Sequence, residues 1–232
     1  MRGPYSDYAA PPIYVYPDRP KPGVHFSRTE LIQLAVAVLA LSAAFTVLYV
    51  RSLLGAFLAN PPLFLAIYFP AALLAVGTGV GLHEVMHKVV AQRYGLWAEF
   101  RYNLRGLGFA FLLAATIGFL YGAPGATWIS GSVTREQNGR ISAAGPVTNI
   151  VIASVLYAAF LVMMPRAATF GGILLVLYLS QAASVNAVLA GFNMIPVMPL
   201  DGAKVWAWNK GAYVGIAAIA IGLFVITVLG PF

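Results

Sequence analysis

Long apolar runs separated by short polar links make up most of the chain. Five runs have the length that a helix needs to cross a bilayer, about 20 residues. They cover residues 30–54, 63–90, 141–164, 173–192 and 212–229. The links contain helix breakers, such as "NPP" at residues 60–62 and the prolines at 196 and 199. This pattern predicts an all-α polytopic membrane protein with about five transmembrane helices.

Two segments between the second and third runs depart from this pattern. In "FRYNLR", residues 100–105, apolar and polar positions alternate, which is the period of a strand. Residues 107–122 are apolar, but they are rich in glycine and short for a membrane span. We therefore expect a short re-entrant or β-hairpin segment here rather than a sixth transmembrane helix.

The distribution of lysine and arginine tests this topology, because basic residues concentrate in loops that stay cytoplasmic. If residues 107–122 do not span, twelve of the 14 basic residues share one side, and only Arg51 and Arg166 face the other. If the segment did span, the two sides would be far more even. The twelve-to-two division predicts a multi-pass protein with a cytoplasmic N-terminus and the C-terminal Phe232 on the opposite face. We expect the membrane to be a prokaryotic cell membrane.

Composition agrees with a single intramembrane domain. The chain is 60% hydrophobic and 9% charged, whereas globular proteins typically carry about 25% charged residues. Residues 1–29, rich in Pro and Tyr, are expected to form a flexible tail, and residues 30–232 the domain. The net charge of +7 does not indicate nucleic-acid binding, because the basic residues are spread over loops. The chain has no cysteine, which excludes disulfides and thiolate metal ligands.

The segment "HEVMH", residues 83–87, places three costly side chains at the end of an apolar run. In a helix, His83 and His87 lie on one face, one turn apart. Two such histidines can bind Zn²⁺, and Glu84 between them can act as a general base. The alternative is an accidental match of polar residues that are each paired elsewhere. The cost of placing them in lipid favours the metal site.

A catalytic zinc usually takes a third protein ligand. Of the other acidic residues, Asp7 and Asp18 lie in the tail, whereas Glu30, Glu99 and Glu136 are expected to be ordinary solvated charges. Asp201 alone follows an apolar run and a proline-broken stretch that would open toward a cavity. The predicted topology also places it on the same membrane face as the histidines. Taken alone Asp201 could equally be a helix N-cap; together these observations favour a metal ligand.

Three elements of the chain resemble the site-2 protease family of intramembrane metalloproteases. They are "HEVMH" at 83–87, "AAGPVTN" at 143–149 and "NMIPVMPLDG" at 193–202. The resemblance implies one Zn²⁺ per chain and hydrolysis of peptide bonds in or near transmembrane segments of single-span membrane proteins, with the active site toward the cytoplasmic side. The PDZ and CBS modules of some relatives are not present in this sequence.

The sequence leaves open the roles of several further residues, as well as two alternative classes of protein. Asn149 and Asn193 are candidates for substrate or oxyanion positioning, or simply for hydrogen bonding between packed helices. The strand-like residues 100–104 could receive an unwound substrate by strand addition. A metal-binding transporter would also place histidine and aspartate at depth, but typically with paired broken helices, which we do not find. A membrane zincin of the CAAX protease type would need a glutamate on a later helix, and no acid follows Glu136 except Asp201.

Overall fold

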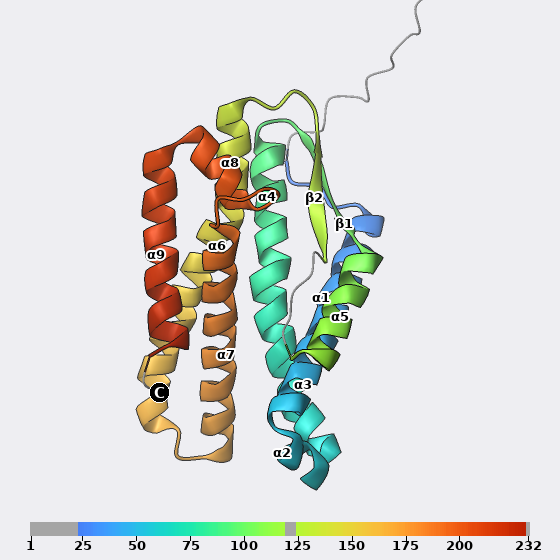
Figure 1. Cartoon of the computed structure of the whole chain (residues 1–232), viewed down its shortest axis with the longest axis vertical. Helices are drawn as coiled ribbons and strands as arrows, with labels where there is room; N and C mark the ends of the chain where they lie inside the picture. The colour runs from blue at the N-terminus through green and yellow to red at the C-terminus, as the bar shows by residue number, and fades with distance from the viewer. Residues whose placement is uncertain (1–22, 119–123, 231–232) are drawn as a thin grey trace, which may run out of the picture.

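The computed structural model describes residues 23–118 and 124–230, and these are predominantly helical (Figure 1). The elements follow one another as α1 (Arg28–Ser52), α2 (Leu54–Ala59), α3 (Pro61–Val76), the π-helical turn η1 (Gly77–Gly81), α4 (Leu82–Arg93), β1 (Trp97–Tyr102), α5 (Leu104–Thr116), β2 (Gly125–Ser130), α6 (Arg135–Met163), the 3₁₀ turn η2 (Met164–Arg166), α7 (Phe170–Asn193), α8 (Asp201–Trp208) and α9 (Lys210–Val228). Among the described residues, five stretches are long and apolar enough to cross a membrane: α1, α3 through α4, α6 with η2, α7 and α9. The predicted fold class is therefore confirmed.

Side-chain caps explain where the spans begin. Asn60 accepts a hydrogen bond from Leu63 N at 3.1 Å, and Pro61 opens α3, as the "NPP" turn predicts. Thr134 and Gln137 form a reciprocal capping box at the start of α6. Helix α6 therefore begins at Arg135, six residues before the predicted span at 141. Its first turns are polar, so an apolar run alone cannot mark this boundary.

The segment between α4 and α6 is a helical excursion closed by a two-stranded sheet. Strands β1 and β2 pair antiparallel, with Phe100 opposite Thr127, and Asn103 N donates to Pro124 O at 2.8 Å. Along the sequence, helix α5 comes between the two strands. In space it runs beside α1, and near its C-terminal end Ala115 O accepts from Arg51 Nη1 at 2.8 Å. Because both ends of the excursion meet in one sheet, the chain returns to the side from which it left. Of the two expected forms, a re-entrant or a β-hairpin segment, this antiparallel pair confirms the hairpin.

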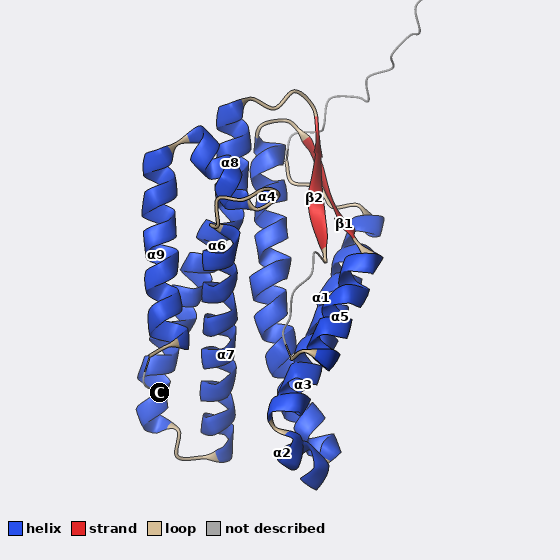
Figure 2. Cartoon of the chain, viewed as in Figure 1, coloured by secondary structure: helices blue, strands red, loops and turns tan. Residues whose placement is uncertain are grey.

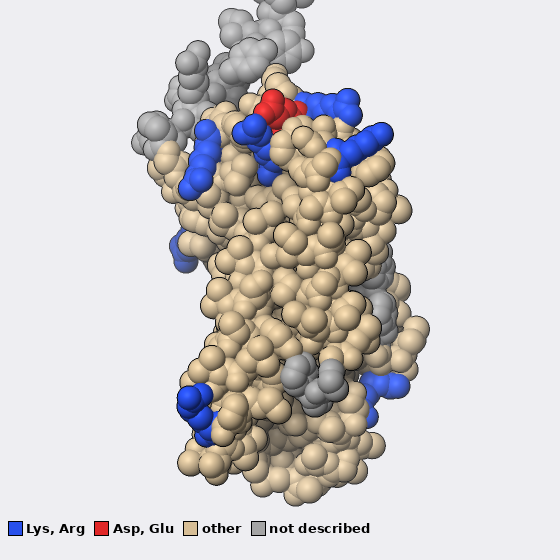
Figure 3. All heavy atoms as spheres, turned by 90° about the vertical axis from the view of Figure 1, so that its left-hand side faces the viewer, with Lys and Arg blue, Asp and Glu red and all other residues tan. Residues whose placement is uncertain are grey.

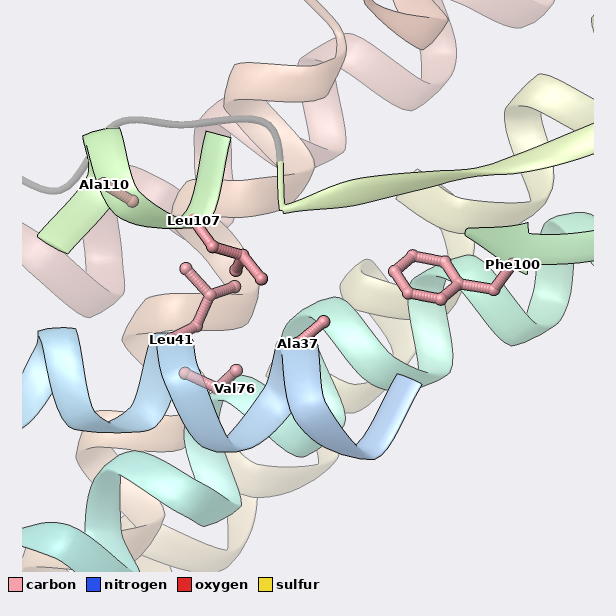
Figure 4. Packing of buried hydrophobic residues seen from close by; sticks show 6 residues of the cluster. All are labelled: Ala37, Leu41, Val76, Phe100, Leu107 and Ala110. Carbon is pink, nitrogen blue, oxygen red and sulfur yellow. The ribbon is translucent and has the colours of Figure 1, made fainter. Parts of the chain in front are cut away.

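Helix α4 stands between two unequal parts of the molecule. On one side lie α6, α7, α8 and α9, and on the other lie the sheet, α1 and α5 (Figure 2). The second part has its own apolar core, in which side chains of α1 meet Val76 of α3, Phe100 of β1 and Leu107 of α5 (Figure 4). This core holds the sheet and α5 against α1, so the sheet has a fixed position beside α4.

One face of the molecule carries its charged residues mainly toward its two ends. On the face shown in Figure 3, lysine, arginine and acidic side chains crowd one end, a few basic side chains mark the other, and most of the middle carries no charge. The first residues of α1 and the last of α9 lie toward opposite ends (Figure 1). This arrangement is what an odd number of spans produces.

The predicted tail over residues 1–29 lies largely outside the described residues. From Gly23 onward the chain is held against α4, because His25 N donates to Gln92 Oε1 at 3.0 Å and Gln92 Nε2 donates to His25 O at 3.3 Å. Helix α1 already begins at Arg28, where Ser27 caps it by accepting from Glu30 N. The domain thus includes the last residues that were assigned to the tail.

Candidate metal centre

His83, His87 and Asp201 form a buried cluster whose donor atoms face one another. His83 Nε2 lies 3.2 Å from Asp201 Oδ2, and His87 Nε2 lies 3.1 Å from the same oxygen. The two imidazole rings stand nearly perpendicular, at 86°, with centroids 4.6 Å apart. All three residues are less than 9% exposed. Within the described part of the chain, this is the one group of three or more such residues that could hold a metal ion.

The other nitrogen of each imidazole is held by an oxygen acceptor on α6. His83 Nδ1 lies 2.7 Å from Asn149 Oδ1, and His87 Nδ1 lies 2.7 Å from the Ile141 carbonyl oxygen. A carbonyl oxygen can only accept, so Nδ1 must carry the hydrogen in each ring. The lone pair is then on Nε2, which points at Asp201. Metal-binding histidines typically have such outer partners, which fix the tautomer and the ring orientation.

The spacing of these donor atoms fits zinc. Zinc bonds of about 2.0–2.2 Å in a tetrahedral arrangement place neighbouring ligand atoms about 3.3 Å apart. The observed separations of 3.1 and 3.2 Å between nitrogen and oxygen are close to this value. Two imidazoles and one carboxylate would leave the fourth position open, as in catalytic rather than structural zinc sites.

A close backbone contact brings Asp201 to the histidines. Asp201 opens α8, and the chain from Met194 to Leu200 turns back over the end of α7. A Cβ on Gly202 would lie 2.4 Å from Met194 O, so only glycine allows this approach. Burial opposes the charged form of Asp201, whereas protonated His87 and His83 beside it hold the pKa of its carboxyl well below the usual range. With the neutral rings that a metal requires, the positive charge beside Asp201 would come from the metal instead. Lys204 Nζ adds a positive charge 3.7 Å from Asp201 Oδ1.

Gly145 provides the space in front of the imidazoles. A Cβ at this position of α6 would lie 2.5 Å from His83 Nε2 and 2.6 Å from His87 Nε2. Any other residue would therefore occupy the region that the ligand atoms face. The "AAGPVTN" element thus contributes two separate features, clearance from Gly145 and a hydrogen-bond acceptor from Asn149.

Glu84 follows His83 directly, so its side chain points about 100° round α4 from that histidine and reaches the sheet. Its Oε2 accepts from Thr127 N at 2.9 Å and lies 2.9 Å from Thr127 Oγ1. The Thr127 hydroxyl is also 3.0 Å from the Glu84 carbonyl oxygen, so its single hydrogen has two alternative acceptors. Thr127 is absent from the expected site residues, because strand β2 gives no clear pattern in "GAPGATWISG".

The two asparagines differ in their surroundings. Asn149 is fully buried and bonded to His83, as described above. Asn193 donates to Leu189 O at 3.0 Å within its own helix, and no bond joins it to the His–His–Asp cluster. The structure therefore brings Asn149 to the cluster and does not do so for Asn193.

Glu30 was expected to be a solvated charge, and the structure shows the opposite. Its carboxylate pairs with Lys88 of α4, and both side chains are 1% exposed. Its second oxygen accepts from Phe100 N of β1 at 3.0 Å. The sequence position of Glu30, at the start of a span, does not reveal which residue it pairs with.

The fold and the site together define a multi-pass membrane protein with a buried metal centre. No family model and no solved structure matches the chain. A curated relative, "Putative zinc metalloprotease MJ0611" of Methanocaldococcus jannaschii, is 38% identical over 202 residues, which cover 86% of this chain and 95% of the relative. The chain belongs to the family of this zinc metalloprotease, and zinc is the metal that its buried cluster fits.

A second relative of the same organism supports this assignment. "Zinc metalloprotease MJ0392" is 27% identical over 159 residues, covering 68% of this chain. The match spans 39% of that relative, so the chain corresponds to less than half of it.

Proposed function

We propose that the chain is an intramembrane zinc metalloprotease of the site-2 type. It hydrolyses peptide bonds in or beside transmembrane segments of single-span membrane proteins. The observation that supports this most directly is the buried His83–His87–Asp201 cluster, which lies among membrane-spanning helices and has a glutamate next to it in α4. Substrates that lie in the same membrane have the most direct access to a cluster placed among spanning helices.

His83, His87 and Asp201 would hold the metal through Nε2, Nε2 and a carboxylate oxygen. Zinc bound in such a site supplies Lewis-acid polarisation of a carbonyl and activation of water. The protein's part is to keep three donors in place and the fourth position clear. Asn149 and the Ile141 carbonyl do the first by fixing both rings, and Gly145 does the second.

Glu84 acts as the general base. Its carboxylate takes the proton of the attacking water and passes it to the leaving amine. Thr127 holds Oε2 through its backbone N–H and hydroxyl, which orients the carboxylate and leaves Oε1 for the proton.

Strand β2 receives the unwound substrate. We expected residues 100–104 of the neighbouring strand to do so, but the outer edge of β1 is covered by α1. There Phe100 N donates to Glu30 Oε1 at 3.0 Å, and Tyr102 N donates to Gln33 Oε1 at 3.1 Å. The outer edge of β2 instead faces α4 at Thr127, beside Glu84. A peptide paired with that edge beside Thr127, whose own N–H stays on Glu84, would place its backbone next to the base and close to the metal ligands.

The basic residues at one end of the molecule support a cytoplasmic N-terminus and an active site toward the cytoplasm. Reporter fusions at both termini test this orientation. Fusions that place the N-terminus outside the cell, or both termini on one side, would contradict it.

The central experiment compares the wild type with Glu84→Gln, using purified protein and a single-span test substrate. The glutamine keeps the volume and removes the proton acceptor, so cleavage should fall by about 10²–10⁴-fold. Elemental analysis should find one zinc per chain in both proteins. A wild type that holds zinc but cleaves nothing would instead favour a metal transporter, and cleavage restricted to prenylated C-termini would favour the CAAX type. Full cleavage by the glutamine variant would reject the role of Glu84.

A further inference from the structure

A chain of polar side chains leads from His83 away from the metal cluster and into the helix bundle. Asn149 Nδ2 donates to the Gly79 carbonyl oxygen at 2.9 Å and to Asn186 Oδ1 at 3.3 Å. Asn186 Nδ2 donates in turn to Thr78 Oγ1 at 2.9 Å. Asn149 and Asn186 are both 0% exposed. The chain thus joins α4, α6, α7 and η1 through four polar side chains in an otherwise apolar region.

The direction of every bond in this chain is determined by backbone carbonyls, which can only accept. Asn186 donates to Ala182 O at 2.8 Å, so its amide nitrogen faces that carbonyl and its oxygen must face Asn149. Thr78 donates its one hydrogen toward Leu74 O at 2.7 Å or Ala75 O at 3.2 Å, so it can only accept from Asn186.

The same reasoning then reaches the histidine. The Asn149 amide nitrogen faces two acceptors, Gly79 O and Asn186 Oδ1, so its oxygen is left for His83. An oxygen 2.7 Å from Nδ1 requires the hydrogen of the neutral imidazole to be on Nδ1. The lone pair of His83 is therefore on Nε2, where a metal can use it.

We propose that Asn186 and Thr78 are positioning residues for the metal centre. They hold the Asn149 amide in the one orientation that presents an oxygen to His83 Nδ1. Without Asn186, one of the two acceptors that fix this amide is lost, and the opposite orientation, with nitrogen facing the histidine, becomes less costly. Neither residue touches the metal ligands, so both act through Asn149. This inference rests on the zinc site of the proposed function, but not on proteolysis.

A purely structural role is the rival explanation, because polar side chains also join helices in membranes. The chain offers a matched control for it. Ser184 lies on α7 two residues from Asn186, and its hydroxyl donates to Thr227 O of α9 at 2.9 Å. Ser184→Ala therefore removes an interhelical bond of the same helix that has no connection to His83.

The test measures the zinc dissociation constant of the purified full chain by competition with a chelator of known affinity. Loss of outer partners of metal-binding histidines typically weakens metal binding 10–100-fold. Because Gly79 O still holds Asn149, we expect the lower end, about tenfold, for Asn186→Leu, and a smaller loss for Thr78→Val. Thr78→Ser, which keeps the hydroxyl, should restore wild-type affinity. Ser184→Ala should leave it unchanged.

Two results would overturn the proposal. One is wild-type zinc affinity in both Asn186→Leu and Thr78→Val. The other is a loss of affinity in Ser184→Ala as large as in Asn186→Leu, which would show that helix packing alone matters. Because the measurement is zinc affinity, it is independent of the protease proposal. A wild type that binds zinc and cleaves nothing would end the proposed function and leave this inference standing.

Discussion

The two sides of helix α4 hold the candidate active site in different ways. On the metal side, formed by α6, α7 and α8, each group that holds a ligand comes from a long helix or from a tightly packed turn at its end. On the hairpin side, formed by α1, β1 and β2, a two-stranded sheet holds Glu84 through one residue, Thr127. One helix thus separates the supports of the proposed metal ligands from the support of Glu84, the proposed base.

This difference indicates that the two functions can be damaged independently. Variants on the metal side should change zinc binding first, and cleavage as a consequence. Variants on the hairpin side should change stability or cleavage while zinc stays bound. For each variant below, the contrary outcome would show that the two sides of α4 do not act independently.

His87→Ala has the largest expected effect, since it removes a ligand from the metal side. Two remaining donors do not make a catalytic zinc site, which usually has three protein ligands. We expect zinc to be absent from the purified protein and cleavage to be undetectable. Elemental analysis with the wild type as reference checks this, and undiminished zinc would reject His87 as a ligand.

Lys88→Met probes the hairpin side one residue further along α4. It leaves the Glu30 carboxylate buried without its partner, which typically costs about 3–5 kcal/mol of unfolding free energy. Chemical denaturation in detergent measures this loss. Zinc affinity of the folded protein should stay near that of the wild type.

The double variant Lys88→Met with Glu30→Gln is the control for this effect. It removes the uncompensated charge and should recover most of the lost stability. If Lys88→Met alone unfolds no more easily than the wild type, the buried pair does not hold the hairpin side in place.

Gly145→Ala returns to the metal side. The added methyl group would lie about where the Nε2 atoms face, so both rings must shift. We expect zinc affinity to fall at least as much as after loss of an outer ligand partner, about 10–100-fold. Gly222→Ala in α9 is a matched control, because a Cβ there meets nothing within 4 Å. Equal zinc affinity in both variants would show that the cluster tolerates the methyl group.

Thr127→Val has the smallest expected effect. It keeps the shape of the side chain and the backbone N–H but removes the hydroxyl that orients Glu84. A hydrogen bond to a charged group is worth about 1.5–3 kcal/mol, and the remaining N–H bond should limit the loss to about tenfold in cleavage rate. Thr127→Ser should behave as the wild type. A fall in zinc content in the valine variant would contradict the separation of the two sides.

Most of the fold is readable from the sequence because the membrane requires long apolar helices. The five spans and the hairpin segment follow from run lengths and from the distribution of basic residues. Strand β2 and the short helix α8 do not, because neither has a repeated pattern long enough to recognise. The observed start of α6, at Arg135, differs from the predicted start at residue 141, because a capping box rather than the apolar run determines it.

The metal cluster itself was predictable because His83, His87 and Asp201 are rare side chains in costly positions. The groups that hold these side chains in place could not be predicted. The Ile141 carbonyl that holds His87 is a backbone group that any residue could supply. The partners of Glu30 and Glu84 lie 58 and 43 positions away along the chain, and only the folded structure brings them together. Sequence patterns show which polar side chains are costly to place in an apolar segment, but not which partners offset that cost.

The π turn at Gly77–Gly81 has a consequence for the phase of its span. The bond from Leu82 N to Gly77 O encloses one residue more than an α-helical turn does. Each residue rotates an α-helix by about 100°, so this extra residue shifts α4 about its axis relative to α3. Deleting one residue here would leave the composition of the span nearly unchanged and turn the histidines away from Asp201. The number of residues in this turn therefore determines the direction in which the two histidines point around the helix axis. The length of the span, which matches it to the bilayer, is a separate property.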